Sequence, residues 1–168
     1  IIWAGKPYPE DYEAIFMFND LIKKSTLFEN CAVLTGYELF LSALLKKGSD
    51  VWLNNPRMYR EASGTSGMTA AMNGSINLSI PDGWVPEFAK DGENSFIIPI
   101  APKGASIEDQ DKTEYENLYK VLHHKVIPLY YENQEKWLQI TKQAMREVVP
   151  FFDSDRMADE YYKRMYNS

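Results

Sequence analysis

Short apolar runs alternate with helical patterns along the first part of the chain. The runs at residues 1–4, 31–35 and 51–53 predict buried strands. Between them, apolar side chains recur at helical spacing: Tyr12, Ile15, Phe16, Phe18 and Ile22 in a helix over residues 10–24, and Leu41, Leu44 and Leu45 in a helix over residues 37–47. This β-α-β-α-β order is typical of a parallel sheet with right-handed crossovers.

The rest of the chain begins with a polar loop and ends in helices. The expected elements are a short helix at residues 68–72, strands at residues 76–80 and 96–98, and helices from residue 106 onward. The small side chains around Thr65 and Ser66 are expected to cap the short helix. We therefore predict an α/β fold, with a Rossmann-like parallel sheet over residues 1–100 and a helical extension over residues 101–168.

Composition and charge exclude several classes of protein. Apolar residues make up 45% of the chain and charged residues 25%, as in an ordinary globular domain. A net charge of −6 without a basic stripe argues against nucleic acid as a partner. The lone Cys31 excludes an internal disulfide. No apolar run is long enough for a transmembrane helix, and the chain opens on a strand without a basic leader. We expect a cytoplasmic protein with no membrane partner, of which this chain is an excised piece.

The most promising chemistry lies in the glycine-rich loop, residues 61–67, between the third predicted strand and a helix start. Ligands of open parallel sheets bind outside the carboxyl ends of the strands, and the free N–H groups of a helix start favour an anion. Gly64 and Gly67 let the backbone approach a ligand, and Glu61 can accept hydrogen bonds from sugar hydroxyls. The pattern favours a phosphate-plus-polyol site and, equally, a capped turn without a ligand.

Other polar residues are weaker candidates. His123 and His124 are adjacent, so on a helix they point about 100° apart and cannot chelate one metal ion; we expect no metal site. Asp82 precedes a glycine, as in a turn, and the turn explains it better than catalysis does. Arg57 is near the loop and can meet a phosphate, but local pairing with Glu61 is the favoured alternative.

Several stretches of sequence match one known family. They are AGKP with a second proline at residues 4–9, DVWLN at 50–54, EASGTSGM at 61–68, NG at 73–74, DGW at 82–84 and VIPLYY at 126–131. Together they resemble the α-glucan phosphorylases, the family of glycogen, starch and maltodextrin phosphorylases. EASGTSGM is the most specific of them, and it is most similar to the shorter branch of the family. The resemblance spans nearly the whole chain.

The resemblance implies a fold and a reaction. The fold is the GT-B architecture, in which the active site lies between two Rossmann-like domains, and this chain would be the distal part of the C-terminal domain. The reaction transfers a glucosyl unit from an α-1,4-glucan to phosphate, releases glucose 1-phosphate and retains configuration. The implied pocket residues are Glu61, Ala62, Ser63 and Gly64, with Glu61 as the catalytic residue. Thr65, Ser66 and Gly67 would lie near the phosphate of pyridoxal phosphate (PLP).

One position departs from the family. Its PLP-anchoring lysine directly follows the methionine of the motif, and this chain has Thr69 there, which cannot form a Schiff base. Related nucleotide-sugar synthases often carry a glutamate at this position, which Thr69 does not match either. The donor is therefore a glucan with phosphate or a sugar nucleotide, or the chain is a silent module that binds glucan or a partner.

Half of the implied cleft is absent from this chain. The family's N-terminal domain and its phosphate-binding lysine and arginine lie upstream, so we expect the chain by itself to be inactive. On the last helix, Tyr161, Tyr162 and Tyr166 are expected to pack against that missing domain.

Overall fold

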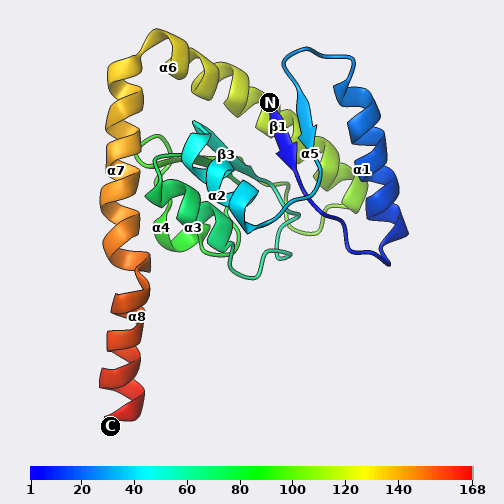
Figure 1. Ribbon diagram of the computed structural model, residues 1–168. Coiled ribbons are helices and arrows are strands. Elements are labelled where there is room, and N and C mark those ends of the chain that lie inside the picture. Colours follow the sequence, from blue (N-terminus) through cyan, green and yellow to red (C-terminus); the bar gives the residue numbers. More distant parts are fainter. Residues whose placement is uncertain (168) are drawn as a thin grey trace. The chain divides into compact units, whose positions relative to one another are not determined.

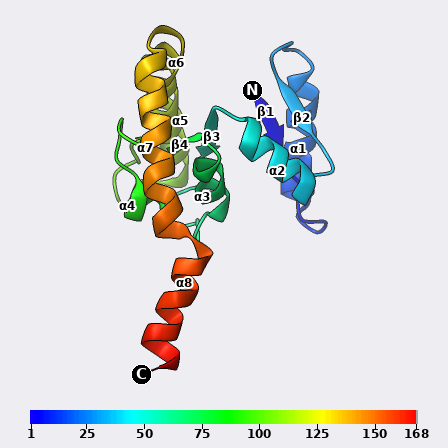
Figure 2. The ribbon, with the colours of Figure 1, turned by 60° about the vertical axis from the view of Figure 1, so that its left-hand side comes forward.

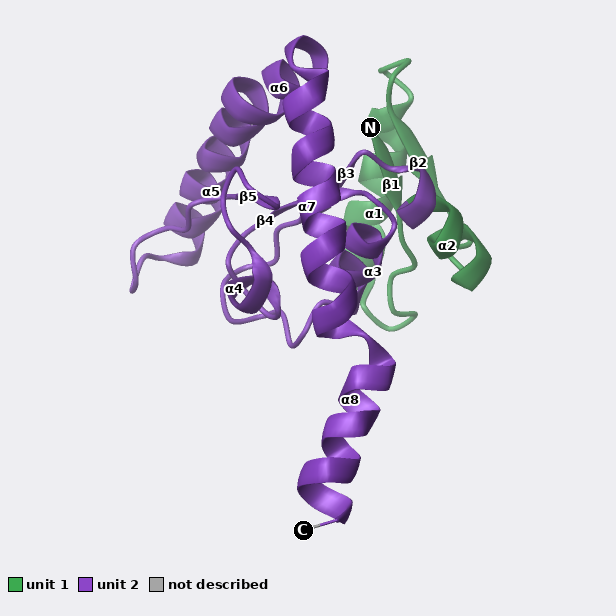
Figure 3. Ribbon diagram, turned by 90° about the vertical axis from the view of Figure 1, so that its left-hand side faces the viewer, with its two compact units in different colours: residues 1–45 green, residues 46–168 purple. Residues whose placement is uncertain are grey.

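The computed structural model describes residues 1–167. Its strands are β1 (Ile2–Ala4), β2 (Ala32–Leu34), β3 (Val51–Asn54), β4 (Ile76–Ser79) and β5 (Ser95–Ile97). Its helices are α1 (Tyr12–Ser25), α2 (Leu39–Gly48), α3 (Thr65–Met72), α4 (Val85–Phe88), α5 (Ile107–Val121), α6 (Ile127–Glu132), α7 (Gln134–Phe152) and α8 (Ser154–Tyr161), with π-helical turns η1 (Leu122–Val126) and η2 (Tyr162–Tyr166). The chain divides into two compact units, Ile1–Leu45 and Lys46–Ser168 (Figure 3).

Unit 1 holds a two-stranded parallel sheet, a full helix and most of α2. β1 and β2 pair from Ile2 with Ala32 to Ala4 with Leu34. The α1 helix begins where Asp11 accepts a hydrogen bond from the Ala14 amide at 2.9 Å. All of residues 1–45 are described, and among them no apolar side chain is buried.

Unit 2 is built on a three-stranded parallel sheet, in the order β3-β4-β5 (Figure 3). Every residue of the central strand β4 is buried, as expected for a parallel strand covered on both faces. The main core cluster includes Ile76, Leu78, Phe96, Trp137 and Ile140, and a second cluster joins α3 and α4 to the later turns of α7.

The helices after β5 pack on this sheet within the same unit. α7 presents buried side chains at helical spacing, on Trp137, Ile140, Ala144 and Val148, and it packs against α3 and β4. Asn133 caps its start with a hydrogen bond to the Lys136 amide at 3.0 Å. α8 follows α7 and extends away from the rest of unit 2 (Figures 1 and 2).

The predicted fold class, α/β with parallel strands, is confirmed, and each expected strand is present within one to two residues. The strands of residues 1–167 pair in two sheets, one in each unit. Pairing is a long-range property that the order of elements does not specify. The predicted domain boundary near residue 100 stays a prediction. The two compact units of the structure are divided at a different place, after Leu45.

Two local expectations were wrong. The short helix begins at Thr65, three residues before the predicted start, because the small residues are part of its first turn. Its N-cap is Gly64, which has no side chain to donate or accept, so Thr65 and Ser66 do not cap it. The sequence pattern also missed the single-turn helix α4 and the two π-helical turns.

Candidate functional site

Residues 61–64 of the glycine-rich loop lead from β3 into α3, and its last three residues form the first turn of that helix. Gly64 stands in the left-handed region, at φ 93° and ψ 44°, where a side chain is strained, and it turns the chain into the helix. Exposure divides the expected site residues into three groups: Ala62, Ser63 and Thr65 are exposed, Glu61, Gly64 and Ser66 are half-buried, and Gly67 is buried. The loop therefore offers one half-buried carboxylate next to accessible backbone.

The start of α3 provides the donors for an anion. The first amides of a helix have no intrahelical partner, which applies here to Thr65 and Ser66. The Gly67 amide already donates to the Gly64 carbonyl oxygen at 3.1 Å, so it is less suited to a ligand than the sequence indicated. The helix dipole adds partial positive charge at this end.

A turn at residues 81–84 is hydrogen-bonded to the glycine-rich loop and to the residue that precedes it. Asp82 Oδ2 accepts hydrogen bonds from the amides of Arg60 and Glu61, both at 3.0 Å. The Trp84 amide donates to the Ser63 carbonyl oxygen at 2.8 Å. Between them, an added Cβ on Gly83 would lie 2.5 Å from that same oxygen, so the position requires glycine. The sequence predicted this turn but missed its hydrogen bonds to the loop.

Asn77 and Trp84 lie behind the first turn of α3. Asn77 Nδ2 donates to the Gly67 carbonyl oxygen at 3.0 Å, while its Oδ1 is buried without a hydrogen-bond partner. A Cβ added to Gly67 would lie 2.7 Å from Asn77 Oδ1 and 3.1 Å from the Trp84 indole nitrogen. Only glycine lets the helix approach β4 this closely.

Thr69 does not fit a covalently bound PLP. Its side chain is a hydroxyl without an amine, and Oγ1 donates to the Thr65 carbonyl oxygen at 2.9 Å. Between Asn54 and Lys90 the sequence contains no lysine that could replace it. The residues of this loop therefore offer no Schiff-base anchor.

Arg57 forms an ion pair with a residue far along the chain. Its Nε and Nη2 donate to the two carboxylate oxygens of Asp111 on α5, at 2.8 and 2.7 Å. Hydrogen bonding from this guanidinium holds the pKa of Asp111 below its usual value. The bidentate pair with Asp111, which the sequence did not predict, ties the polar loop to the helical region.

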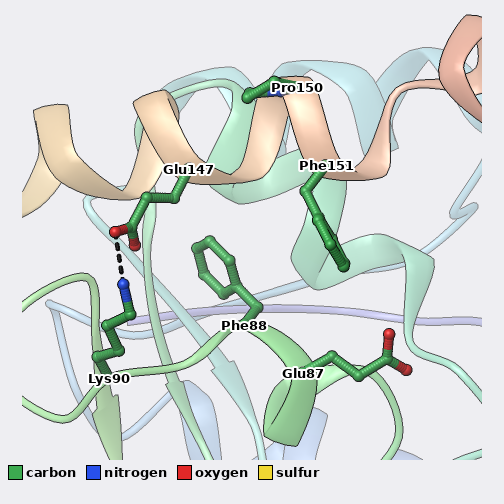
Figure 4. Close-up of a pocket in the computed structure, with 6 residues that line it drawn as sticks. All are labelled: Glu87, Phe88, Lys90, Glu147, Pro150 and Phe151. Carbon is green, nitrogen blue, oxygen red and sulfur yellow. Dashed lines mark hydrogen bonds and ion pairs between the residues drawn. The ribbon is translucent and has the colours of Figure 1, made fainter.

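A separate pocket of about 340 Å³ lies between α4 and the end of α7, lined by Glu87, Phe88, Lys90, Glu147, Pro150 and Phe151 (Figure 4). Lys90 Nζ donates to Glu147 Oε1 at 2.7 Å. This bond lowers the pKa of Glu147, as do bonds from Asn94 and Gln143, and it raises the pKa of Lys90. None of the lining residues belongs to the glycine-rich loop.

The remaining candidates lie on the surface. His123 and His124 are exposed on η1, where His123 stacks on Tyr119 with ring centroids 4.2 Å apart. Residues 1–167 contain no group of three or more His, Cys, Asp or Glu arranged to hold a metal ion. Across that same range, every helix is too short or too polar to cross a membrane.

Structural comparison defines the class of the chain. It superimposes over 99% of its length on 40% of HepE from Anabaena, solved in complex with UDP-glucose, with a TM-score of 0.65 at 14% sequence identity. At this identity the likeness concerns the fold alone. The chain is part of the C-terminal domain of a GT-B fold, followed by a helical extension.

Sequence comparison defines the family. No family model matches the chain. It is 36% identical to maltodextrin phosphorylase of Thermococcus litoralis and 38% identical to glycogen phosphorylase of Aquifex aeolicus, in each case over 99% of this chain. It is also 42% identical to the uncharacterised protein MJ1631 of Methanocaldococcus jannaschii. The chain spans 20–31% of the length of these relatives. It belongs to the glycogen and maltodextrin phosphorylase family, as a segment consistent with the C-terminal part.

Proposed function

We propose that this chain is the donor-side part of a retaining hexosyltransferase of the phosphorylase type. Such an enzyme transfers the terminal glucosyl unit of an α-1,4-glucan to phosphate and releases glucose 1-phosphate. The observation that carries the proposal is the glycine-rich loop, with half-buried Glu61 beside the open amides of Thr65 and Ser66. The match to phosphorylases along 99% of the chain supports it.

Each part of the loop has a proposed role. The Glu61 carboxylate accepts hydrogen bonds from hydroxyls of the glucosyl unit, and the exposed residues Ala62 and Ser63 line the same pocket. The amides of Thr65 and Ser66 bind a phosphate group at the positive end of α3. In the reaction, the anomeric carbon exchanges its bond to the glucan oxygen for a bond to a phosphate oxygen, and the glucan oxygen takes the proton that the hydrogen phosphate gives up. Because Thr69 does not fit a covalent PLP, no step is assigned to that cofactor.

The cleft is completed by another part of the same polypeptide. We propose that an N-terminal domain provides the second wall, that the tyrosines of α8 and η2 contact it, and that the protein is cytoplasmic. Tyr161, Tyr162 and Tyr166 are all exposed here, which is what such a contact requires.

A sugar nucleotide is the second candidate donor, because Thr69 matches neither the lysine of the phosphorylases nor the glutamate of the synthases and so leaves the donor open. Without a lysine at this position, the helix start is a general anion site that accepts a diphosphate as readily as a phosphate. A silent module that binds glucan without turnover is the third candidate.

One assay on the intact polypeptide separates these candidates. Glycogen is incubated either with inorganic phosphate or with a sugar nucleotide. Release of glucose 1-phosphate supports the phosphorylase, release of nucleoside diphosphate supports the synthase, and glucan binding without turnover supports the silent module.

For the phosphorylase, Glu61→Gln should lower turnover roughly 10- to 100-fold by weakening charge-assisted hydrogen bonds to the sugar. Glu87→Gln, at an exposed glutamate outside the loop, is the matched control. Turnover by the 168-residue chain by itself would contradict the split site.

A further inference from the structure

We propose that Trp84 is the positioning residue of the glycine-rich loop, and that Phe152 at the end of α7 holds Trp84 in place. What the loop binds rests on the proposed function above, whereas its positioning does not. Trp84 has two separate contacts with the loop, one through its backbone and one through its indole ring.

The backbone contact fixes the middle of the loop. The Trp84 amide donates to the Ser63 carbonyl oxygen at 2.8 Å, one residue before the left-handed Gly64. Asp82, two residues before Trp84, accepts hydrogen bonds from the amides of Arg60 and Glu61. Because these bonds come from one short turn, the loop backbone moves with that turn.

The indole contact fixes the end of the loop and the start of α3. Trp84 is only 2% exposed. Its ring lies against both glycines: a Cβ added to Gly64 would lie 3.0 Å from Cδ1, and one added to Gly67 would lie 3.1 Å from Nε1. With no side chain on either glycine, the indole touches the backbone itself. A tilt of the ring would therefore displace the amides at the start of α3.

Aromatic contacts connect this ring to the C-terminal helices. Phe88 stacks on Trp84 with centroids 4.8 Å apart and an interplanar angle of 24°, and Phe152 meets Trp84 edge-on at 5.1 Å and 89°. Both geometries are favourable for aromatic pairs. Phe152 is the last residue of α7, next to the Asp153 that caps α8. The junction of α7 and α8 thus sets the position of a ring that supports the loop.

Phe151 provides a matched control for Phe152. It is the same residue type, one position earlier, and is 46% exposed. Its ring meets Phe152 at 4.8 Å and lies under the Arg156 guanidinium at 4.9 Å, whereas the edge-on contact with Trp84 is made by Phe152. Substitution of Phe151 alters the same helix end and leaves that contact in place.

The test uses amide hydrogen exchange, read residue by residue by NMR on the 168-residue chain. Phe152→Leu should speed exchange of the Trp84 and Gly67 amides about two- to tenfold, the size expected from losing the edge-to-face contact between Phe152 and Trp84. Exchange at Leu78 in β4 should stay the same. Phe152→Tyr keeps the ring and should behave as the unmodified chain does, as should Phe151→Leu. Unchanged loop exchange in Phe152→Leu, an equal change in β4, or an equal effect of Phe151→Leu would overturn the proposal.

A second readout connects the positioning to binding. Inorganic phosphate titrated into the intact polypeptide should bind about two- to tenfold more weakly to Phe152→Leu than to the unmodified protein, and equally to Phe151→Leu. If the unmodified protein fails to bind phosphate, the proposed function fails, and the exchange data still decide the role of Trp84. If it binds phosphate and all variants bind equally, the proposal about Trp84 fails while the proposed function stands.

Discussion

The two units contain the same kind of sheet and cover it differently. In unit 2, helices supply apolar side chains to the sheet, and residues such as Ile76 and Ile140 are almost fully buried. In unit 1, only Ser42 is buried, while Phe16, Leu39 and Phe40 are largely exposed. Parallel sheets are stable when both faces are covered, and an isolated pair of strands is marginal in water. Unit 2 thus carries its own core, whereas unit 1 lacks one in this chain.

Separating the units should produce the largest effect. We expect residues 49–168 to unfold cooperatively on heating and residues 1–48 to show no cooperative transition, because about 45 residues without a buried core cannot offset the entropy of ordering. Far-UV circular dichroism during heating measures both transitions. The cut after α2 leaves every helix intact. A sharp transition in the shorter piece would contradict the comparison.

Removing a core side chain should have a smaller effect that depends on the unit. Ile140→Ala, at a residue 1% exposed, should lower the free energy of unfolding by about 2–5 kcal/mol, since it leaves a cavity against the sheet. Ile15→Ala, at a half-buried position on α1, should cost about 1 kcal/mol or less. Urea unfolding of the whole chain gives both values. Similar losses for the two variants would show that unit 1 has an equivalent core.

Lowering the pH should have the smallest effect on stability, and a carboxylate of unit 2 should contribute more to this effect than one of unit 1. The lowered pKa of Glu147 means that its charged form is stabilised in the folded state. Its contribution is present above the ordinary glutamate pKa of 4.5 and is lost as pH falls through the lowered value. Urea midpoints at about pH 6 and pH 3 should therefore differ less in Glu147→Gln than in the unmodified chain.

The matched control lies in unit 1. Glu38 pairs with Lys6 at 3.1 Å, and its side chain is 69% exposed. Glu38→Gln should leave the pH dependence unchanged, because an exposed pair contributes little. If it reduces the dependence as much as Glu147→Gln does, burial does not explain the difference between these two carboxylates.

Sequence reasoning proposed the glycine-rich loop as the candidate site and missed the contacts that hold this loop in place. Residues 61–64 lie between β3 and α3, as predicted, because glycine and a strand end are local signals, whereas residues 65–67 form the first turn of α3. Asp82 was predicted to be an ordinary turn residue, yet it accepts two amides of a segment about 20 residues away. Arg57 pairs with Asp111, which lies 54 residues away and which no local pattern indicated.

The sequence by itself determined most of the element types, the class of fold and the family. Each of these depends on periodicity, on glycine placement or on a specific string of residues, all of which are local. Only the tertiary structure decided which strands pair, that Gly64 caps α3, and that Trp84 lies between the loop and Phe152. These features depend on contacts between distant segments, and such contacts are selected by the packing of the whole core, which no local pattern encodes.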